Sequence, residues 1–284
     1  MFDIGLSANG AGPIFPLIED CGRAGIKYFE LFMGRDAWVD FDLDLVHRHA
    51  DDAGVTIRSY HLPFWPDCNL ASASREEREA TISAHAELIS RGTAHGVRIY
   101  TVHPGAEPVD DGERRECIEC AKDSLCRLAE IADRAGAVLA VEDLPRSCPG
   151  HNTEEMLEIL SCDARLKSCL DTNHILYEPL YDYIRAVGDR LIGTHISDYD
   201  LVSERHYMPG EGLVDWQKVV KLLEEVGYTG PWLYEINCRS AESEAGRMYC
   251  TEDFVHNAGE IFAGKKPTML RDGKWTSDTT SLCG

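Results

Sequence analysis

Short apolar runs alternate with longer amphipathic segments along almost the whole chain, and this alternation limits the folds that are open to it. The longer segments repeat apolar residues with the 3.6-residue period of a helix, as Leu125, Leu128 and Ile131 do. Strands that alternate with helices form a parallel sheet with right-handed crossovers, and eight such units close naturally into a (β/α)₈ barrel. The short runs predict eight strands, at residues 2–7, 28–32, 56–60, 98–103, 138–142, 166–171, 191–195 and 232–235.

An open, doubly wound sheet is the alternative to a barrel. The chain has no GxGxxG after the first predicted strand and no GxxxxGK(S/T), so a nucleotide-binding sheet of that kind would lack its phosphate-binding loop. No low-complexity linker divides the sequence. We therefore predict a single-domain α/β protein, a TIM barrel over residues 1–264. A polar C-terminal tail without periodicity, residues 265–284, follows it and could contact a neighbouring subunit of a homo-oligomer.

The chain is strongly acidic, with 28 basic and 49 acidic residues and a net charge of −21. This charge opposes non-specific binding to nucleic acid or to anionic membranes. No apolar run approaches the roughly 18 residues of a membrane span, and the first residues lack the features of a secretory signal. The 11 cysteines are an odd number, which favours reduced thiols and a cytoplasmic protein. Cys117 and Cys120 lie within a helical pattern, so we interpret them as structural.

Six consecutive predicted strands end in a histidine, an aspartate or a glutamate. In a (β/α)₈ barrel the active site is built at the carboxyl ends of the strands, so these side chains are expected to meet there. A buried polar group needs a partner, and six of them in register are difficult to explain by packing alone. The six residues are His61, His103, Glu142, Asp171, His195 and Glu235.

The last four of these residues suggest a metal centre. Glu142, Asp171, His195 and Glu235 offer three carboxylates and one imidazole from adjacent strands. This set of oxygen and nitrogen ligands suits Mn²⁺, Mg²⁺ or Co²⁺ better than a structural zinc ion, which prefers thiolates. We expect one divalent ion, with Mn²⁺ as the first choice and Zn²⁺ as a further one. The alternative is a buried network of ion pairs.

Several short motifs follow one another in the order and spacing of a known family. The chain resembles the xylose isomerase-like superfamily of sugar isomerases and epimerases, which includes ketose 3-epimerases, inosose dehydratases and endonuclease IV. The resemblance covers about residues 1–262 and implies that the same four residues are metal ligands. It also implies that His174 and the segment before PGEG, with Arg205 and His206, contact substrate. The motifs are VHPG (102–105), VED (141–143), DTNH (171–174), HISD (195–198), PGEG (209–212) and YEI (234–236).

The chemistry expected of such a site is proton transfer on a small polyhydroxylated substrate, free or phosphorylated. A metal ion beside a ketose favours loss of a proton as an enediolate. Glu142 and Glu235 would act from opposite faces and invert a carbon centre, whereas one carboxylate acting alone would isomerise aldose and ketose. The hydride-shift route normally uses a second metal and a lysine, and no predicted strand ends in lysine.

Three further side chains are expected near the substrate, each with an open alternative. His61 and His103 would donate hydrogen bonds to substrate oxygens, or act as additional metal ligands, or be ordinary core histidines. Trp65 would form one wall of the pocket or serve only in packing.

Endonuclease IV provides a rival interpretation, because nine residues hold its three zinc ions and this chain nearly matches that set. Only Glu204 departs, where that enzyme has aspartate, while ketose 3-epimerases place an arginine near position 206. The acidic charge and the lack of basic loops oppose a nuclease, since phosphate contacts dominate DNA affinity. We therefore predict a sugar or polyol isomerase or epimerase; a metal phosphoesterase and a dehydratase or lyase remain as alternatives. The nine positions are His61, His103, Glu142, Asp171, His174, His195, Glu204, His206 and Glu235.

Overall fold

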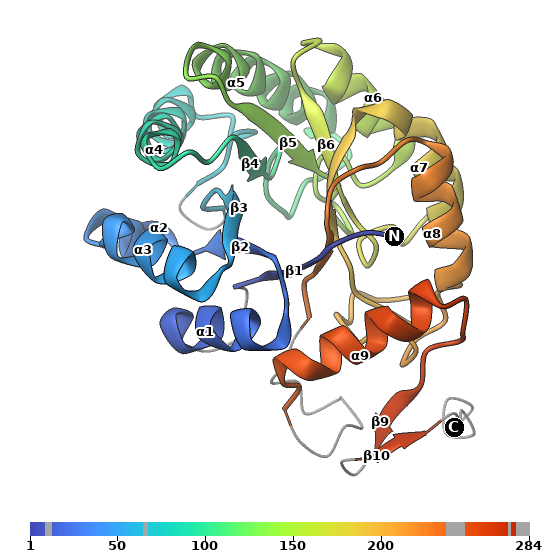
Figure 1. Ribbon diagram of the computed structural model, residues 1–284. Coiled ribbons are helices and arrows are strands. Elements are labelled where there is room, and N and C mark those ends of the chain that lie inside the picture. Colours follow the sequence, from blue (N-terminus) through green and yellow to red (C-terminus); the bar gives the residue numbers. More distant parts are fainter. Residues whose placement is uncertain (9–12, 65–67, 237–247, 272–273, 277–284) are drawn as a thin grey trace.

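Eight parallel strands form a nearly closed barrel surrounded by helices (Figure 1). The computed structural model describes residues 1–8, 13–64, 68–236, 248–271 and 274–276. The strand order is β7-β6-β5-β4-β3-β2-β1-β8, and a parallel bridge between Ile196 and Tyr234 joins the two ends of the sheet. The predicted TIM-barrel fold is therefore confirmed. The strands are β1 (Ile4–Ser7), β2 (Tyr28–Phe32), β3 (Thr56–His61), β4 (Ile99–Val102), β5 (Val138–Glu142), β6 (Lys167–Asp171), β7 (Leu191–His195) and β8 (Trp232–Tyr234).

A helix follows each of the eight barrel strands, and the second unit has two. Asp215 begins α8 by accepting a hydrogen bond from the backbone amide of Lys218. Gly54 ends α3 in the left-handed conformation at φ 72°, which a residue without a Cβ adopts easily. The helices are α1 (Ile14–Ala24), α2 (Arg35–Val39), α3 (Leu43–Ala53), α4 (Arg75–Ala94), α5 (Arg114–Arg134), α6 (Thr153–Ser161), α7 (Leu180–Val187), α8 (Trp216–Glu225) and α9 (Thr251–Phe262), with a 3₁₀ turn at Gly188–Arg190.

The apolar core lies between the strands and the surrounding helices, and one glycine permits its closest contact. Tyr60 of β3 and Tyr100 of β4 are fully buried and pack against α4 at Gly92. A Cβ at Gly92 would lie 2.5 Å from the Tyr100 hydroxyl oxygen and 2.6 Å from the ring of Tyr60. Only glycine therefore lets this helix approach the barrel so closely.

The C-terminal segment packs on the barrel without joining its sheet. The strands β9 (Met269–Arg271) and β10 (Lys274–Thr276) pair with each other in an antiparallel, two-stranded sheet. Leu270 is buried and belongs to the apolar core. Across the described residues, no helix combines the length and the apolarity that a membrane crossing requires.

Candidate functional site

A cavity of about 320 Å³ opens at the carboxyl ends of the strands. Its lining contains most of the residues that the sequence predicted for the site. Phe64 stacks on His103, with 4.1 Å between the ring centres, and forms an apolar side of the cavity. The predicted residues in its lining are His61, His103, Glu142, His174, His206 and Glu235.

The four predicted metal ligands converge at this end of the barrel. Glu142 ends β5, Asp171 ends β6, His195 ends β7 and Glu235 follows β8. One potential ligand atom from each lies within 4.8 Å of the others. Nδ1 of His195 lies 2.8 Å from Oε1 of Glu142 and 3.1 Å from Oε2 of Glu235. All four side chains are buried, so the group could hold a divalent cation away from bulk water.

Asp171 shows that the group fits a cation. Its Oδ1 accepts a hydrogen bond from the backbone amide of Asn173, whereas its buried Oδ2 has no hydrogen-bond partner among the described residues. Burial raises the pKa of Asp171 to about 7. The nearby His174 and His206 oppose this rise in pKa only in part, and the negative charges of Glu235 and Glu142 add to it. A carboxylate buried near two others is unfavourable unless a positive charge compensates it. A divalent ion with oxygen ligands would supply that charge.

Two further groups of potential ligands adjoin the first. His61 and His103 form one of these groups with Glu142. Their Nε2 atoms lie 3.0 and 3.1 Å from Oε2 of Glu142. His174 and His206 form the second group with Asp171. The three groups share Glu142 and Asp171, so they form one continuous polar centre.

Backbone carbonyl groups orient three of these imidazole rings. Nδ1 of His61 donates to the carbonyl of Leu62, and Nδ1 of His174 donates to that of Asp143. Nδ1 of His206 lies 3.2 Å from the carbonyl oxygen of Glu235. A ring nitrogen that donates to a carbonyl leaves the other nitrogen free to act as a ligand or an acceptor.

One predicted substrate contact, Arg205, stands apart from this centre. The side chain of Arg205 pairs with Asp200, with 2.9 Å between Nε and Oδ2, and is not part of the cavity lining. Trp65 lies outside the described residues.

Reasoning from strand ends missed three charged side chains of the site: Glu30, Arg146 and its partner Glu107. Glu30 lies in the middle of β2 and contacts His195 from inside the barrel. The sequence feature that could have identified Glu30 is a single carboxylate within the apolar run YFELF. Arg146, in the loop after β5, lines the cavity and pairs with Glu107 and Glu204. No sequence pattern singles out this arginine.

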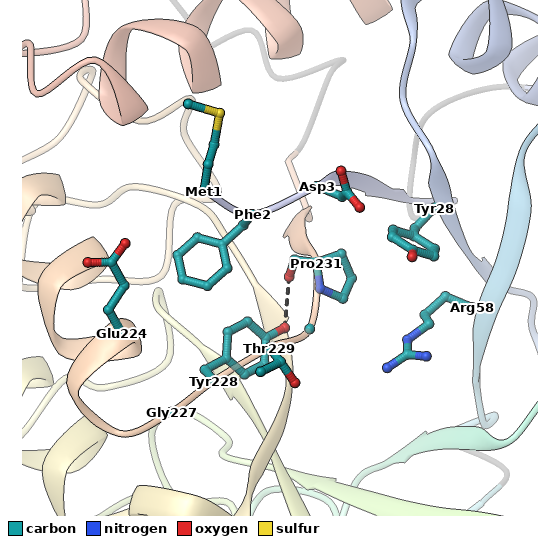
Figure 2. Close-up of a pocket in the computed structure, with 11 residues that line it drawn as sticks. Met1, Phe2, Asp3, Tyr28, Arg58, Glu224, Gly227, Tyr228, Thr229 and Pro231 are labelled. Carbon is teal, nitrogen blue, oxygen red and sulfur yellow. Dashed lines mark hydrogen bonds between the residues drawn. The ribbon is translucent and has the colours of Figure 1, made fainter.

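A second cavity, of about 540 Å³, lies at the opposite mouth of the barrel (Figure 2). It is lined by the residues that precede β1 and β8, including Phe2, Asp3 and Tyr228, with Arg58 of β3. Although it is larger, the groups of potential metal ligands in the described chain lie at the other end. We therefore assign the chemistry to the smaller cavity, where barrel enzymes carry their active sites.

The chain belongs to the xylose isomerase-like TIM barrel family, whose model matches residues 18–250. The uncharacterised protein MJ1188 of Methanocaldococcus jannaschii is 28% identical over 238 residues, which cover 81% of this chain and 84% of that protein. Fructoselysine 3-epimerase of Escherichia coli O157:H7 is 32% identical over 114 residues, which cover only 38% of this chain and 42% of the epimerase.

Solved structures of sugar epimerases share the fold. A D-tagatose 3-epimerase-like protein superposes with a TM-score of 0.80 at 21% identity, covering 93% of this chain and 97% of that one. D-Psicose 3-epimerase from Clostridium cellulolyticum H10, solved with D-tagatose, gives a TM-score of 0.73 at 18% identity, covering 85% and 86%. At these identities the likeness establishes the fold alone.

Proposed function

We propose that this protein is a divalent-metal-dependent isomerase or epimerase of a small sugar or related polyol. The observation that carries the proposal is the convergence of Glu142, Asp171, His195 and Glu235 at the active-site end of the barrel. Three carboxylates and one imidazole suit Mn²⁺, which is the ion we propose. The cavity of about 320 Å³ is near the lower end of the usual range for ligand pockets, which suits a small substrate.

The proposed reaction is proton transfer at a carbon next to a carbonyl group. When bound, the cation polarises the carbonyl and a neighbouring hydroxyl oxygen of the substrate. Glu142 removes a proton from one face of the carbon, and Glu235 returns one to the other face, or the two exchange roles. The centre is then inverted through an enediolate. If one glutamate both removes and returns the proton, the product is the aldose–ketose isomer.

The histidines around the two glutamates suit the binding of a polyol. His61, His103 and His174 border the cavity, with one nitrogen of His61 and of His174 held by a backbone carbonyl. Nε2 of His61 and Nε2 of His103 contact Glu142, and substrate hydroxyl groups would compete with that carboxylate for them. We propose that these histidines orient the substrate, and that Phe64 covers its less polar side.

Turnover in deuterated water tests the proposal with a panel of ketoses and Mn²⁺. Deuterium should enter the product at the reacting carbon, and Glu142→Gln or Glu235→Gln should abolish turnover. Glu211→Gln is the matched control, because Glu211 is also buried but hydrogen-bonds to the Met208 amide and to Tyr249. Turnover that persists in both site variants would reject the assignment of the two glutamates.

A metal-dependent phosphoesterase is the second candidate, favoured by the three adjoining groups of potential ligands. The net charge of −21 weighs against a DNA substrate. Elemental analysis should therefore give one divalent ion per chain, and an abasic DNA duplex should bind more weakly than about 1 μM even in about 50 mM salt. Three zinc ions, with incision at the lesion that is lost in His206→Ala, would establish the phosphoesterase instead.

A further inference from the structure

Glu30 is a buried carboxylate that the proposed reaction does not use. It lies on β2, only 2% exposed, and its Oε1 is 2.8 Å from Nε2 of His195. The two residues are 165 positions apart in the sequence and meet inside the barrel. The contact is on the side of the imidazole ring that faces away from Glu142 and Glu235.

Two hydroxyl groups hold the Glu30 carboxylate in place. Ser59 of β3 donates to its Oε2 over 2.7 Å, and Thr101 of β4 donates to the same oxygen over 2.9 Å. An irregularity in the pairing of β2 and β3, between Phe29 and Glu30, sets Glu30 directly opposite Ser59. Both hydroxyl groups thus occupy one carboxylate oxygen, which leaves the other to His195.

Both nitrogens of His195 face carboxylates, but only one faces the proposed metal ligands. Nδ1 lies 2.8 Å from Glu142 and 3.1 Å from Glu235, while Nε2 faces Glu30. A neutral imidazole carries its proton on one nitrogen. If Nε2 donates that proton to Glu30, the lone pair of Nδ1 points at the ligand group.

We propose that Glu30 is a positioning residue, which holds His195 in the tautomer and orientation that make Nδ1 a metal ligand. The inference rests on the proposed metal-dependent function and adds to it a residue that contacts a metal ligand without binding the ion itself. The negative charge of Glu30 also makes the imidazole a stronger ligand. Carboxylates that support a ligand histidine in this way typically change metal affinity by about 10- to 100-fold.

A purely structural role for Glu30 makes a different prediction. An ion pair that only stabilised the barrel would, when broken, lower the free energy of unfolding and leave the affinity for metal unchanged. Metal affinity and the spectrum of the bound ion therefore distinguish the two roles, while thermal unfolding alone does not.

The test is calorimetric titration of the metal-free full chain with Mn²⁺ and Co²⁺, together with the visible spectrum of the Co²⁺ form. Glu30→Gln should raise the Kd at least about tenfold and change the Co²⁺ spectrum, and Glu30→Asp should recover part of the affinity. Asp198→Asn is the matched control. Asp198 is equally buried but accepts hydrogen bonds from Gly210, Val214 and Trp216, so its loss should affect unfolding and leave metal affinity unchanged.

An affinity for metal within about twofold of wild type in Glu30→Gln, with an unchanged Co²⁺ spectrum, would overturn the proposal. If that variant does not fold, Ser59→Ala and Thr101→Val decide the question, because each removes one donor to Glu30. Both should weaken metal binding several-fold, and unchanged binding in both overturns the proposal. A wild-type chain that binds neither ion would refute the proposed function as well, whereas loss of the Glu30 effect alone refutes only this inference.

Discussion

The guanidinium of Arg146 holds the carboxylate of Glu107 at the mouth of the active-site cavity, with 2.8 Å between Nε and Oε1. The same guanidinium also pairs with Glu204. Glu204 in turn lies 3.0 Å from Nε2 of His206. Arg146 therefore connects the loops that follow β4, β5 and β7 at the entrance to the site.

Replacing Arg146 with alanine should impair substrate binding more than folding. Loss of the bridge separates Glu204 and its loop from the loops that follow β4 and β5. We expect KM to rise about three- to tenfold with a smaller change in kcat. The side chain is 48% exposed, so the ion pairs should contribute less than about 1 kcal/mol to stability. Arg165→Ala is the control, because Arg165 pairs with Asp163 near the start of β6, at the other end of the barrel. An unchanged KM in Arg146→Ala would contradict this role.

Asp171→Asn should have opposite effects on metal affinity and on the stability of the metal-free protein. Asparagine keeps an oxygen for the Asn173 amide but removes a buried negative charge, so the metal-free variant should unfold at a higher temperature than metal-free wild type. The Kd for Mn²⁺ should rise at least about tenfold. Calorimetric titration and thermal unfolding with and without chelator measure both effects. Equal metal binding by the two proteins would exclude Asp171 from the ligand set.

In the metal-free protein, two raised pKa values should lower the free energy of unfolding as the pH rises. The pKa of Asp171 is raised to about 7 by burial and nearby carboxylates, and that of His206 is raised to about 9, chiefly by Glu204, Asp171 and Glu235 against the effect of burial. In both cases the folded protein holds a proton that the unfolded chain has already lost. The contribution of these two groups to the free energy of unfolding of the metal-free protein should therefore fall between about pH 4 and pH 9. Burial lowers the pKa values of His47 and His85 to about 4, which acts in the opposite direction at low pH, so the decline should be clearest between about pH 6.5 and pH 9.

Metal binding should counteract this trend, because the ion replaces the proton on Asp171. The affinity for Mn²⁺ should rise steeply up to about pH 7, with release of at least one proton per ion bound. Titrations in buffers of different ionisation enthalpy count the protons released. An affinity that does not change between about pH 5 and pH 7 would argue against Asp171 as a ligand.

Replacing two helix glycines with alanine should change the free energy of unfolding in opposite directions. Gly92→Ala in α4 forces a Cβ to within 2.6 Å of the buried Tyr60 and Tyr100 side chains, so we expect a loss of about 1–3 kcal/mol in the free energy of unfolding. A Cβ at Gly259 in α9 meets nothing within 4 Å, so Gly259→Ala should gain up to about 1 kcal/mol from helix propensity. Denaturant unfolding of the pair measures both effects. A stabilised Gly92→Ala would contradict the close packing at this position.

The sequence by itself determined the fold and placed six strand-end side chains at one mouth of the barrel. Periodicity is a local property, and the observed strands begin and end within two residues of the predicted runs. Because parallel strands of a barrel end at one mouth, residues such as His61 and Glu235 could be placed together without knowing any contact. No local sequence pattern predicts the contacts of Tyr60 and Tyr100 with Gly92.

Only the tertiary structure decided how each of these side chains is held and what surrounds it. The contact of Glu30 with His195 depends on closure of the barrel and on the irregular pairing of β2 with β3. The bridge from Arg146 to Glu204 depends on the paths of two loops. The physical reason is that hydrogen bonds and ion pairs are set by distances of a few ångströms between groups far apart in the chain, and no local pattern of residues encodes those distances.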